Sequence, residues 1–287
     1  MNNLVQFNIG GVPEHFNLPW HIAMEQELFA KNGISLNWTD YPGGTGAMTK
    51  DLREKNLDIA VLLTEGIIND ISKGNPCQII SQYVSTPLIW GIHVPASAAY
   101  NHIEDIIGKK YAISRLGSGS HIMAYVDATQ RGWKISDDQL VVVGDIDGAR
   151  KAFKNNEAQI FLWEKFMTKP LVDAGECKRI GECPTPWPCF VIAAREEVIK
   201  KFPEALKKLV EVINISSTQF MKNEQAADLV SLKYSLKPED AAEWISKTRW
   251  ACGEQLLEND FIKVVENLSE IGIIENIPRY EMVCGKI

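Results

Sequence analysis

The order of apolar and polar positions in the first part of the chain alternates between strand and helix patterns. Residues from Val5 to Ile9 alternate as a half-buried strand does, and the turn-forming stretch from Gly10 to Pro13 follows. Apolar residues then recur at helical spacing from Leu18 to Asn32. The succession continues with strands over 34–41, 57–64 and 77–84 and helices over 47–55 and 65–73. Strands that alternate with helices pair in parallel, so the pattern predicts a parallel α/β sheet.

The alternation of strand and helix patterns is interrupted between Thr86 and Pro95. We interpret this extended run as a crossover into a second lobe. Beyond it, strands are predicted over 110–114, 140–143 and 159–163, and helices over 122–130 and 148–155. A further strand over 188–193 precedes helices over 195–200, 203–222, 223–232, 237–250 and 259–272. The prediction is an α/β protein whose first lobe comprises residues 1–88 and 192–287 and whose second lobe comprises residues 89–191.

A short internal echo supports two similar lobes. Gly46-Ala47, Leu52 and Asp58-Ile59 reappear, one residue closer together, as Gly148-Ala149, Phe153 and Gln159-Ile160. Both sets describe a helix that leads into a buried strand. Two lobes joined by two chain crossings form a hinge, and we expect a ligand in an interlobe cleft.

Composition narrows the classes of function. The 287 residues include 30 basic and 37 acidic side chains, so the net charge is −7, which argues against nucleic-acid binding. The 45% hydrophobic content is ample for two cores. The apolar runs are much shorter than the roughly 18 residues of a membrane-spanning helix, so we expect no membrane span. The sequence does not specify the oligomeric state.

The expected location follows from the N-terminus and the cysteines. The stretch from Met1 to Phe7 has no basic start, no apolar region and no cleavage site, so we expect a cytoplasmic protein. If a signal has been removed from this sequence, the location is instead periplasmic or secreted. Six cysteines spread through a chain of this size indicate free thiols rather than a disulfide framework.

Two glycine-rich loops are the first candidates for a binding site. Ligands of parallel sheets bind beyond the carboxyl ends of the strands, where loops lead into helix N-termini. The segments 43–46 and 117–120 occupy such positions, and their backbone N–H groups and hydroxyls suit a carboxylate, sulfonate or phosphate. Neither is a P-loop, because no Gly-Lys-Ser/Thr follows. The structural alternative is that glycine only allows a tight turn before each helix.

Indoles and carboxylates in the same loops point to an organic ligand. Flat aromatic surfaces beside a few acids suit a planar heterocycle or an amine better than an inorganic anion. The structural alternative is that these tryptophans belong to the core. The predicted ligand-binding residues are Gly11, Glu14, His15, Trp20, Gly43, Gly44, Thr45, Glu65, Gly117, Ser118, Gly119, Ser120, His121, Trp163, Glu164 and Trp187.

Catalytic and metal-binding motifs are not evident. The chain has no Gly-x-Ser-x-Gly elbow and no His-Glu-x-x-His motif. Cys177, Cys183 and Cys189 are separated by five residues each time, unlike the Cys-x-x-Cys spacing of zinc and redox sites. We predict no catalytic residue, no metal site and no cofactor.

Several of these segments resemble the type II periplasmic-binding-protein superfamily. The similarity rests on Pro42-Gly43-Gly44-Thr45, Leu57-Asp58-Ile59-Ala60, Arg115-Leu116-Gly117-Ser118-Gly119, Trp163-Glu164 and Pro188-Cys189-Phe190. It covers about residues 4 to 225 and is closest to the group that binds nitrate, alkanesulfonates and thiamine precursors. The resemblance implies a two-lobed Venus-flytrap fold that closes on a small ligand.

The same group contains an enzyme, the fungal synthase that makes the pyrimidine half of thiamine from its own histidine and pyridoxal phosphate, with iron and a cysteine-rich loop. The positions of its lysine and histidine correspond here to Leu62 and Gly66, and its cysteine cluster to 187–191, where only Cys189 remains. A Schiff base needs an amine, and the pyrimidine needs an imidazole. We therefore expect non-catalytic binding, with an enzyme of thiamine pyrimidine biosynthesis as the alternative.

Overall fold

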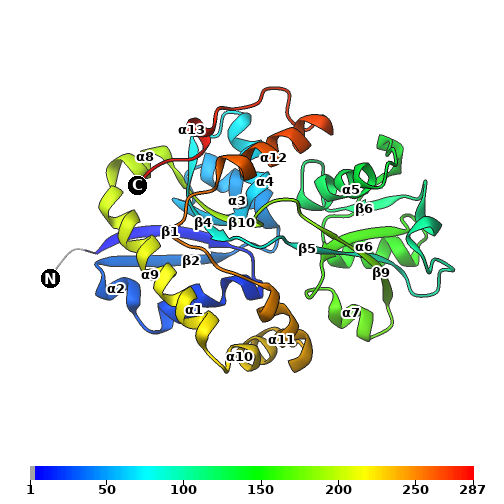
Figure 1. The fold of residues 1–287 in the computed structure, drawn as a ribbon, viewed down its shortest axis with the longest axis horizontal. Helices are drawn as coiled ribbons and strands as arrows, with labels where there is room; N and C mark the ends of the chain where they lie inside the picture. Colours follow the sequence, from blue (N-terminus) through cyan, green and yellow to red (C-terminus); the bar gives the residue numbers. More distant parts are fainter. Residues whose placement is uncertain (1–3) are drawn as a thin grey trace. The chain divides into compact units, whose positions relative to one another are not determined.

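The computed structural model describes residues 4–287, and the chain divides into two compact units, each with its own five-stranded sheet (Figure 1). Unit 1 comprises residues up to Thr86, Trp187–Ser269 and Ile274–Ile287, and unit 2 comprises Pro87–Pro186 and Glu270–Ile273. The α/β, two-lobed prediction is confirmed.

The sheet of unit 1 has the strand order β2-β1-β3-β10-β4. Its strands are β1 (Val5–Gly11), β2 (Ile34–Asp40), β3 (Ile59–Leu63), β4 (Cys77–Val84) and β10 (Phe190–Arg195). Strand β1 pairs in parallel with β2 and β3, whereas β10 runs antiparallel between β3 and β4. The four strands that alternate with helices therefore run in one direction, as the pattern predicts, and the strand that returns from unit 2 runs against them.

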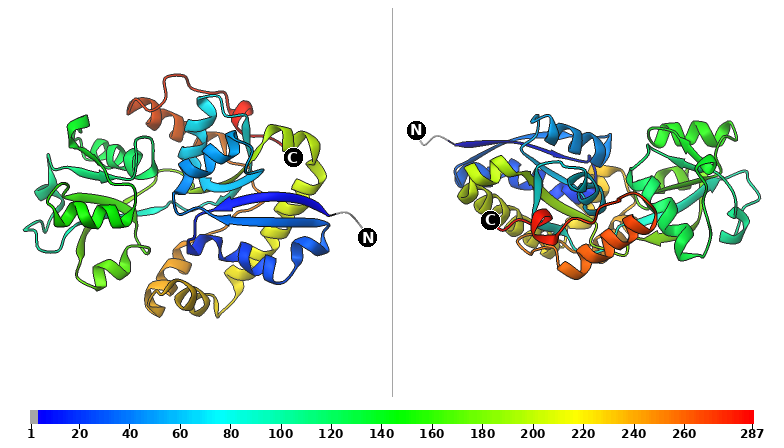
Figure 2. Two further views of the ribbon diagram at one scale, coloured as in Figure 1. Left: turned by 180° about the vertical axis from the view of Figure 1, so that it is seen from behind. Right: turned by 90° about the horizontal axis from the view of Figure 1, so that it is seen from above.

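The helices of unit 1 follow the predicted order with one break. The pattern over 18–32 forms two helices, because Glu27 between them has a left-handed backbone with φ of 55°. Helices α1 and α9 pack against each other (Figure 2). The helices that start in unit 1 are α1 (Leu18–Glu25), α2 (Leu28–Lys31), α3 (Gly44–Arg53), α4 (Thr64–Ser72), α8 (Glu196–Lys201), α9 (Pro203–Lys222), α10 (Ala226–Tyr234), α11 (Pro238–Lys247), α12 (Glu258–Glu270) and α13 (Tyr280–Val283), and a 3-10 turn covers His15–Asn17.

Unit 2 repeats this plan with the strand order β7-β6-β8-β5-β9. Its strands are β5 (Ile89–Pro95), β6 (Tyr111–Ile113), β7 (Leu140–Val142), β8 (Ile160–Glu164) and β9 (Cys177–Pro184), and its helices are α5 (Gly119–Gln130), α6 (Ile146–Lys154) and α7 (Lys169–Asp173), with 3-10 turns at Ile103–Ile106 and Asp137–Gln139. Strand β6 pairs in parallel with β7 and β8, and β5 runs antiparallel to β8 and β9. The extended run that we interpreted as a crossover is thus a strand, and β9 lies outside the predicted strands.

The two sheets share one topology. In each sheet, the antiparallel strand is the first one that the chain forms after it arrives from the other unit. This strand is β10 in unit 1 and β5 in unit 2. The internal echo of the sequence maps onto α3 and β3 in the first sheet and α6 and β8 in the second. It therefore marks equivalent positions of two similar units.

The central strands are buried on both faces, as expected beneath helices. Four successive residues of β3, Ile59 to Leu62, are fully buried, and every residue of β10 is buried. Within residues 4–287, no helix combines the length and the hydrophobicity that crossing a bilayer requires.

Candidate functional site

The carboxyl end of β3 is the most tightly assembled part of the predicted site in unit 1. The Thr45 hydroxyl accepts a hydrogen bond from the Leu63 backbone N–H at 3.2 Å and so ties the start of α3 to the end of β3. A Cβ added at Gly66 would lie only 2.4 Å from Cγ2 of Thr45. Glycine at position 66 therefore allows α4 to begin directly against the Thr45 side chain.

Glu65 lies in the first turn of α4 and contacts Trp187 across 122 residues of sequence. The Trp187 indole N–H donates to Oε2 of Glu65 at 2.8 Å, and both side chains are buried, at 1% and 0% exposure. Oε1 of Glu65 has no hydrogen-bond partner within residues 4–287. A buried acceptor without a partner costs about 1–3 kcal/mol, so an additional donor at Oε1 would be stabilising.

Burial also changes the titration of Glu65. Desolvation raises the pKa of its carboxyl to about 7, although its own backbone N–H and the Trp187 indole act in the opposite direction. The carboxyl is therefore close to half-protonated at neutral pH. A buried carboxyl that can exchange a proton near pH 7 is typical of functional sites.

The segment after β1 contributes an acid and a histidine of different character. Glu14 is half-buried, and desolvation raises the pKa of its carboxyl to about 7. His15 is completely buried and stacks on Trp244 with ring centroids 4.2 Å apart and an interplanar angle of 7°. Burial lowers the pKa of His15 to about 3, so its ring is neutral. His15 thus forms part of an aromatic cluster of unit 1.

Two further predicted residues of unit 1 pack inside it. Trp20 is 0% exposed and stacks on Phe29 at 5.6 Å, with Trp38 nearby at 5.8 Å. A Cβ at Gly11 would lie 2.5 Å from the Trp38 ring. The structure therefore places Trp20 in the core, the alternative that we raised for the tryptophans, and Gly11 at a close approach of backbone and indole.

The first glycine-rich loop has the conformation expected of a tight turn into α3. Gly43 is the N-cap residue of α3, and Gly44 has φ of 65°, a left-handed conformation that side chains other than glycine rarely adopt. Gly43 is exposed and Thr45 is buried. The loop therefore fixes Thr45 on β3 while Gly43 stays accessible.

In the second glycine-rich loop, the hydroxyls bond within the loop. The Ser118 hydroxyl caps α5 by accepting from the His121 N–H at 3.3 Å. The Ser120 hydroxyl accepts from the Ser114 N–H at 2.9 Å and lies 3.1 Å from the Ser118 hydroxyl. These groups stabilise the turn, so fewer of them are available to a ligand than the sequence predicts.

His121 belongs to the same network. Its Nδ1 accepts from the Gly117 N–H at 2.9 Å, which places the ring proton of the neutral form on Nε2. Desolvation lowers the pKa of His121. The first two N–H groups of α5, those of Gly119 and Ser120, have no acceptor in the described part of the chain. They are the donors that this loop can offer.

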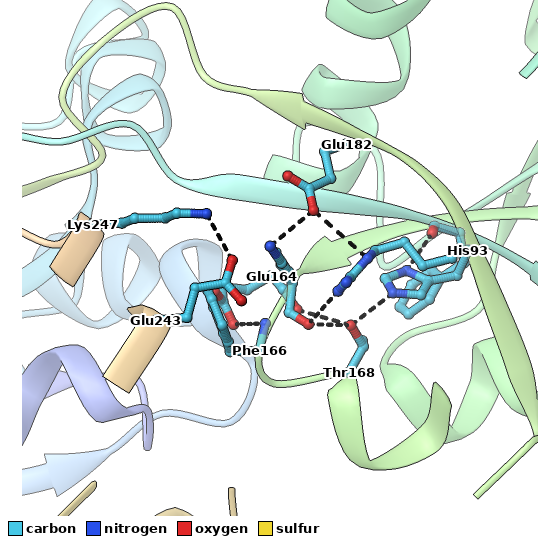
Figure 3. Close-up of polar contacts among 10 residues, drawn as sticks. His93, Glu164, Phe166, Thr168, Glu182, Glu243 and Lys247 are labelled. Carbon is cyan, nitrogen blue, oxygen red and sulfur yellow. Dashed lines mark hydrogen bonds and ion pairs between the residues drawn. The ribbon is translucent and has the colours of Figure 1, made fainter. Parts of the chain in front are cut away.

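The end of β8 carries Trp163 and Glu164. Oε2 of Glu164 accepts from the backbone N–H groups of Phe166 and Met167 at 2.8 and 2.7 Å, and Figure 3 shows the Phe166 contact. Trp163 is half-buried and stacks on Phe161 with centroids 5.2 Å apart. Glu164 therefore closes the turn after the strand, and Trp163 packs on the hydrophobic core of unit 2.

The structure brings part of the predicted set together and adds neighbours. Thr45, Glu65 and Trp187 meet around the start of α4, and the serines of the second loop meet around the start of α5. Gly66 is not among the predicted ligand-binding residues, although a glycine inside a helical pattern can mark close packing. Within residues 4–287, no group of three or more His, Cys, Asp or Glu side chains could hold a metal ion.

Comparisons with known proteins agree with this architecture. A family model described as Ca3427-like PBP matches residues 90–183. The CA3427 gene product of Candida albicans, whose structure is described as having the generic periplasmic binding protein fold, is 26% identical, with a TM-score of 0.88 over 95% of this chain and 92% of that chain. No curated protein matches the sequence.

Two bacterial binding proteins share the fold at lower identity. The alkanesulfonate-binding protein SsuA of Xanthomonas axonopodis pv. citri is 13% identical, with a TM-score of 0.79 over 97% of this chain and 96% of that one. The nitrate-binding protein NrtA of Synechocystis PCC 6803 is 15% identical, with a TM-score of 0.70 over 95% and 83%. The chain therefore has a type II periplasmic-binding-protein fold of the kind found in the nitrate and sulfonate group.

Proposed function

We propose that this protein binds a small organic molecule and releases it unchanged, using loops at the carboxyl ends of its parallel strands. The fold supports this proposal, because SsuA and NrtA are named for the alkanesulfonate and the nitrate that they bind. The ligand-binding groups that we assign to unit 1 are Glu65, Trp187 and the loop from Gly43 to Thr45.

The observation that carries the proposal is the Glu65 carboxyl. One oxygen is held by the Trp187 indole, whereas the other is buried without a donor. A ligand N–H placed at Oε1 would satisfy it with a charge-assisted hydrogen bond. This chemistry favours an amine or a nitrogen heterocycle over nitrate or sulfate, which have only acceptor oxygens and a negative charge.

Within that class, we assign a thiamine-precursor-like ligand, a planar pyrimidine with an exocyclic amine. Such a ring carries N–H donors for Glu65 at its edge and an apolar face for packing. Sulfonates are the competing ligands, because a protonated Glu65 could donate to a sulfonate oxygen. The two cases differ in the protonation state of Glu65 that binds, so they differ in their pH dependence.

The test is calorimetric titration with a 4-aminopyrimidine, an alkanesulfonate, nitrate and sulfate at pH 6 and pH 8. The proposal predicts saturable binding of the aminopyrimidine that strengthens as pH rises through about 7, the pKa of Glu65, since the ionised carboxylate is the acceptor. Glu65→Gln abolishes this pH dependence. The control Glu211→Gln changes an exposed acid on α9 and leaves it unchanged. Tighter binding of nitrate or sulfate than of every organic compound contradicts the proposal.

A separate incubation distinguishes the enzyme alternative from binding without conversion. Protein mixed with pyridoxal phosphate and iron is examined for a visible absorption band and for a single-turnover pyrimidine product. Binding without conversion supports the proposal, and product formation replaces it with a role in thiamine pyrimidine synthesis.

A further inference from the structure

Unit 2 contains a hollow that none of the loops discussed above lines. It has a volume of about 580 Å³ and lies over the face of the sheet that α6 and α7 cover. Helix α6 supplies one wall, Thr168 and Leu171 at the start of α7 supply the other, and β5, β8 and β9 supply the base. This volume falls within the roughly 300–1,000 Å³ of small-molecule pockets. All of its lining residues belong to unit 2.

The base and walls of the hollow are largely apolar. Phe161 and Ala149, at 3% and 1% exposure, are the most buried of its apolar lining residues. Ile146, Phe153 and Leu171 line the hollow as well and are only half-buried. Half-buried aliphatic and aromatic side chains around a hollow gain stability when an apolar body covers them.

A fixed polar pair lies in the same hollow. His93 is 0% exposed, with Nδ1 3.2 Å from the carbonyl oxygen of Phe161 and Nε2 2.9 Å from the Thr168 hydroxyl (Figure 3). A carbonyl only accepts, so Nδ1 carries the proton and Nε2 accepts from Thr168. Burial lowers the pKa of His93 to about 4, so the ring is neutral. A Cβ at Gly91 would lie 2.5 Å from Cε1 of His93, so glycine there leaves the ring its place.

The rim carries an excess of positive charge that its acids do not neutralise. Arg150 donates to Glu176 at 2.7 and 3.0 Å and to Asp147 at 2.8 Å, so these three groups pair with one another. Lys151 and Lys154 also line the hollow, are exposed, and form no ion pair within 4.0 Å in the part of the chain that the structure describes. Two ammonium groups at the edge of an apolar hollow suit a ligand with one anionic end.

We propose that this hollow is a second binding site, which takes a small organic anion with an apolar body such as a medium-chain carboxylate. The apolar body covers Phe161, Phe153 and Ile146, and the carboxylate lies between Lys151 and Lys154. The neutral His93–Thr168 pair closes the base without repelling or attracting charge. This site is independent of the Glu65 site, because no residue is shared.

The test uses octanoate as the probe, with its neutral counterpart octanamide, followed by the NMR methyl signals of Ile146 and Leu171. We expect saturable shifts of these signals with octanoate and at least tenfold weaker binding of octanamide. Lys151→Ala/Lys154→Ala is expected to weaken octanoate at least tenfold. The matched control, Lys110→Ala/Lys134→Ala, removes two exposed charges of the same unit outside the hollow and leaves the affinity within twofold.

Four results would overturn this assignment. Equal affinity for octanamide and octanoate rejects the anionic class, and equal losses in the two double variants reject the lysine rim. Shifts confined to the start of α5, or no shift at millimolar octanoate, reject the hollow itself. Glu65→Gln should leave octanoate binding unchanged, so failure here is distinguishable from failure of the proposed function.

Discussion

The two units have equivalent strand orders, but the acid at the carboxyl end of the central parallel strand has different hydrogen-bond partners in each. In unit 2, Oε2 of Glu164 accepts from two backbone N–H groups at 2.8 and 2.7 Å. In unit 1, Glu65 receives one indole N–H on Oε2, and its Oε1 is buried without a partner. The shared topology therefore places an acid near the same sheet edge twice.

The unpartnered oxygen distinguishes a candidate ligand-binding acid from a structural acid. A carboxylate that accepts from the turn following its own strand stabilises that turn, and its hydrogen-bonding capacity is largely used. A buried carboxyl with one oxygen unpartnered keeps capacity for an external donor, and burial raises its pKa to about 7 in Glu65. We therefore expect mutations of the two acids to differ in kind, one in stability and the other in pH dependence.

The largest effect is expected for Glu164→Ala. The substitution leaves the buried Phe166 N–H and the half-buried Met167 N–H without their charged acceptor, and two such bonds correspond to a loss of about 4 kcal/mol. Urea unfolding measures it, with Glu157→Ala, an exposed acid of the same unit, as the control. A loss below about 1 kcal/mol would remove the distinction between the two acids.

The next effect concerns pH. Because the folded pKa of Glu65, about 7, lies above the ordinary glutamate value of 4.5, the folded state holds the extra proton and stability falls as pH rises from 4.5 to 7. The difference between wild type and Glu65→Gln in the free energy of unfolding should therefore change by about 3 kcal/mol across this window.

Wild type must be compared with Glu65→Gln because His15 changes the free energy of unfolding with pH in the opposite direction. Its folded pKa of about 3 lies below 6.5, so its contribution increases stability as pH rises over that range. Subtracting the variant's curve removes this common term. A difference curve that is flat between pH 4.5 and 7.5 would show that Glu65 is not buried as described.

A smaller effect tests how closely Thr45 packs at the start of α4. Gly66→Ala should destabilise unit 1 by about 2 kcal/mol, since the new Cβ would meet Cγ2 of Thr45 at 2.4 Å. Thr45→Ser removes that methyl group, and the double variant Thr45→Ser/Gly66→Ala should recover most of the loss. Additive losses in the double variant would show that the contact is not the cause.

The smallest effect is expected for Trp187→Phe. Removing the indole N–H deletes the side-chain donor that stabilises the ionised form of Glu65, so the pKa of Glu65 should rise further. The stability change from the lost hydrogen bond is about 1 kcal/mol. Titration of the Glu65 carboxyl by ¹³C NMR measures the shift, and a lowered pKa would contradict the assigned geometry.

Periodicity predicted most elements but not their directions. A continuous apolar run locates β10, but such a run is the same in a parallel and an antiparallel strand, so it does not predict the antiparallel directions of β10 and β5. Strand β9 was missed because Cys177–Pro184 is rich in charged and half-exposed residues. The break at Glu27 carries no glycine or proline and so gives no local signal.

The candidate site shows the same division. Glu65 and Trp187 could both be selected from the loops that hold them, but their contact spans 122 residues, which no local pattern reveals. Similarly, His15 was a predicted ligand-binding residue, but it stacks on Trp244 of a distant helix and so belongs to an aromatic cluster. The hydrogen bond between the Ser118 and Ser120 hydroxyls depends on the backbone geometry of the loop, which its composition does not reveal.

The most direct measurement asks whether a bound molecule returns unchanged. The protein is saturated with the 4-aminopyrimidine, separated from the excess compound and denatured. Mass spectrometry then identifies and quantifies the released compound. We expect one unaltered molecule per chain, with occupancy reduced in Glu65→Gln and retained in Glu211→Gln. A released compound of altered mass, or equal occupancy in both variants, would contradict binding without transformation at Glu65.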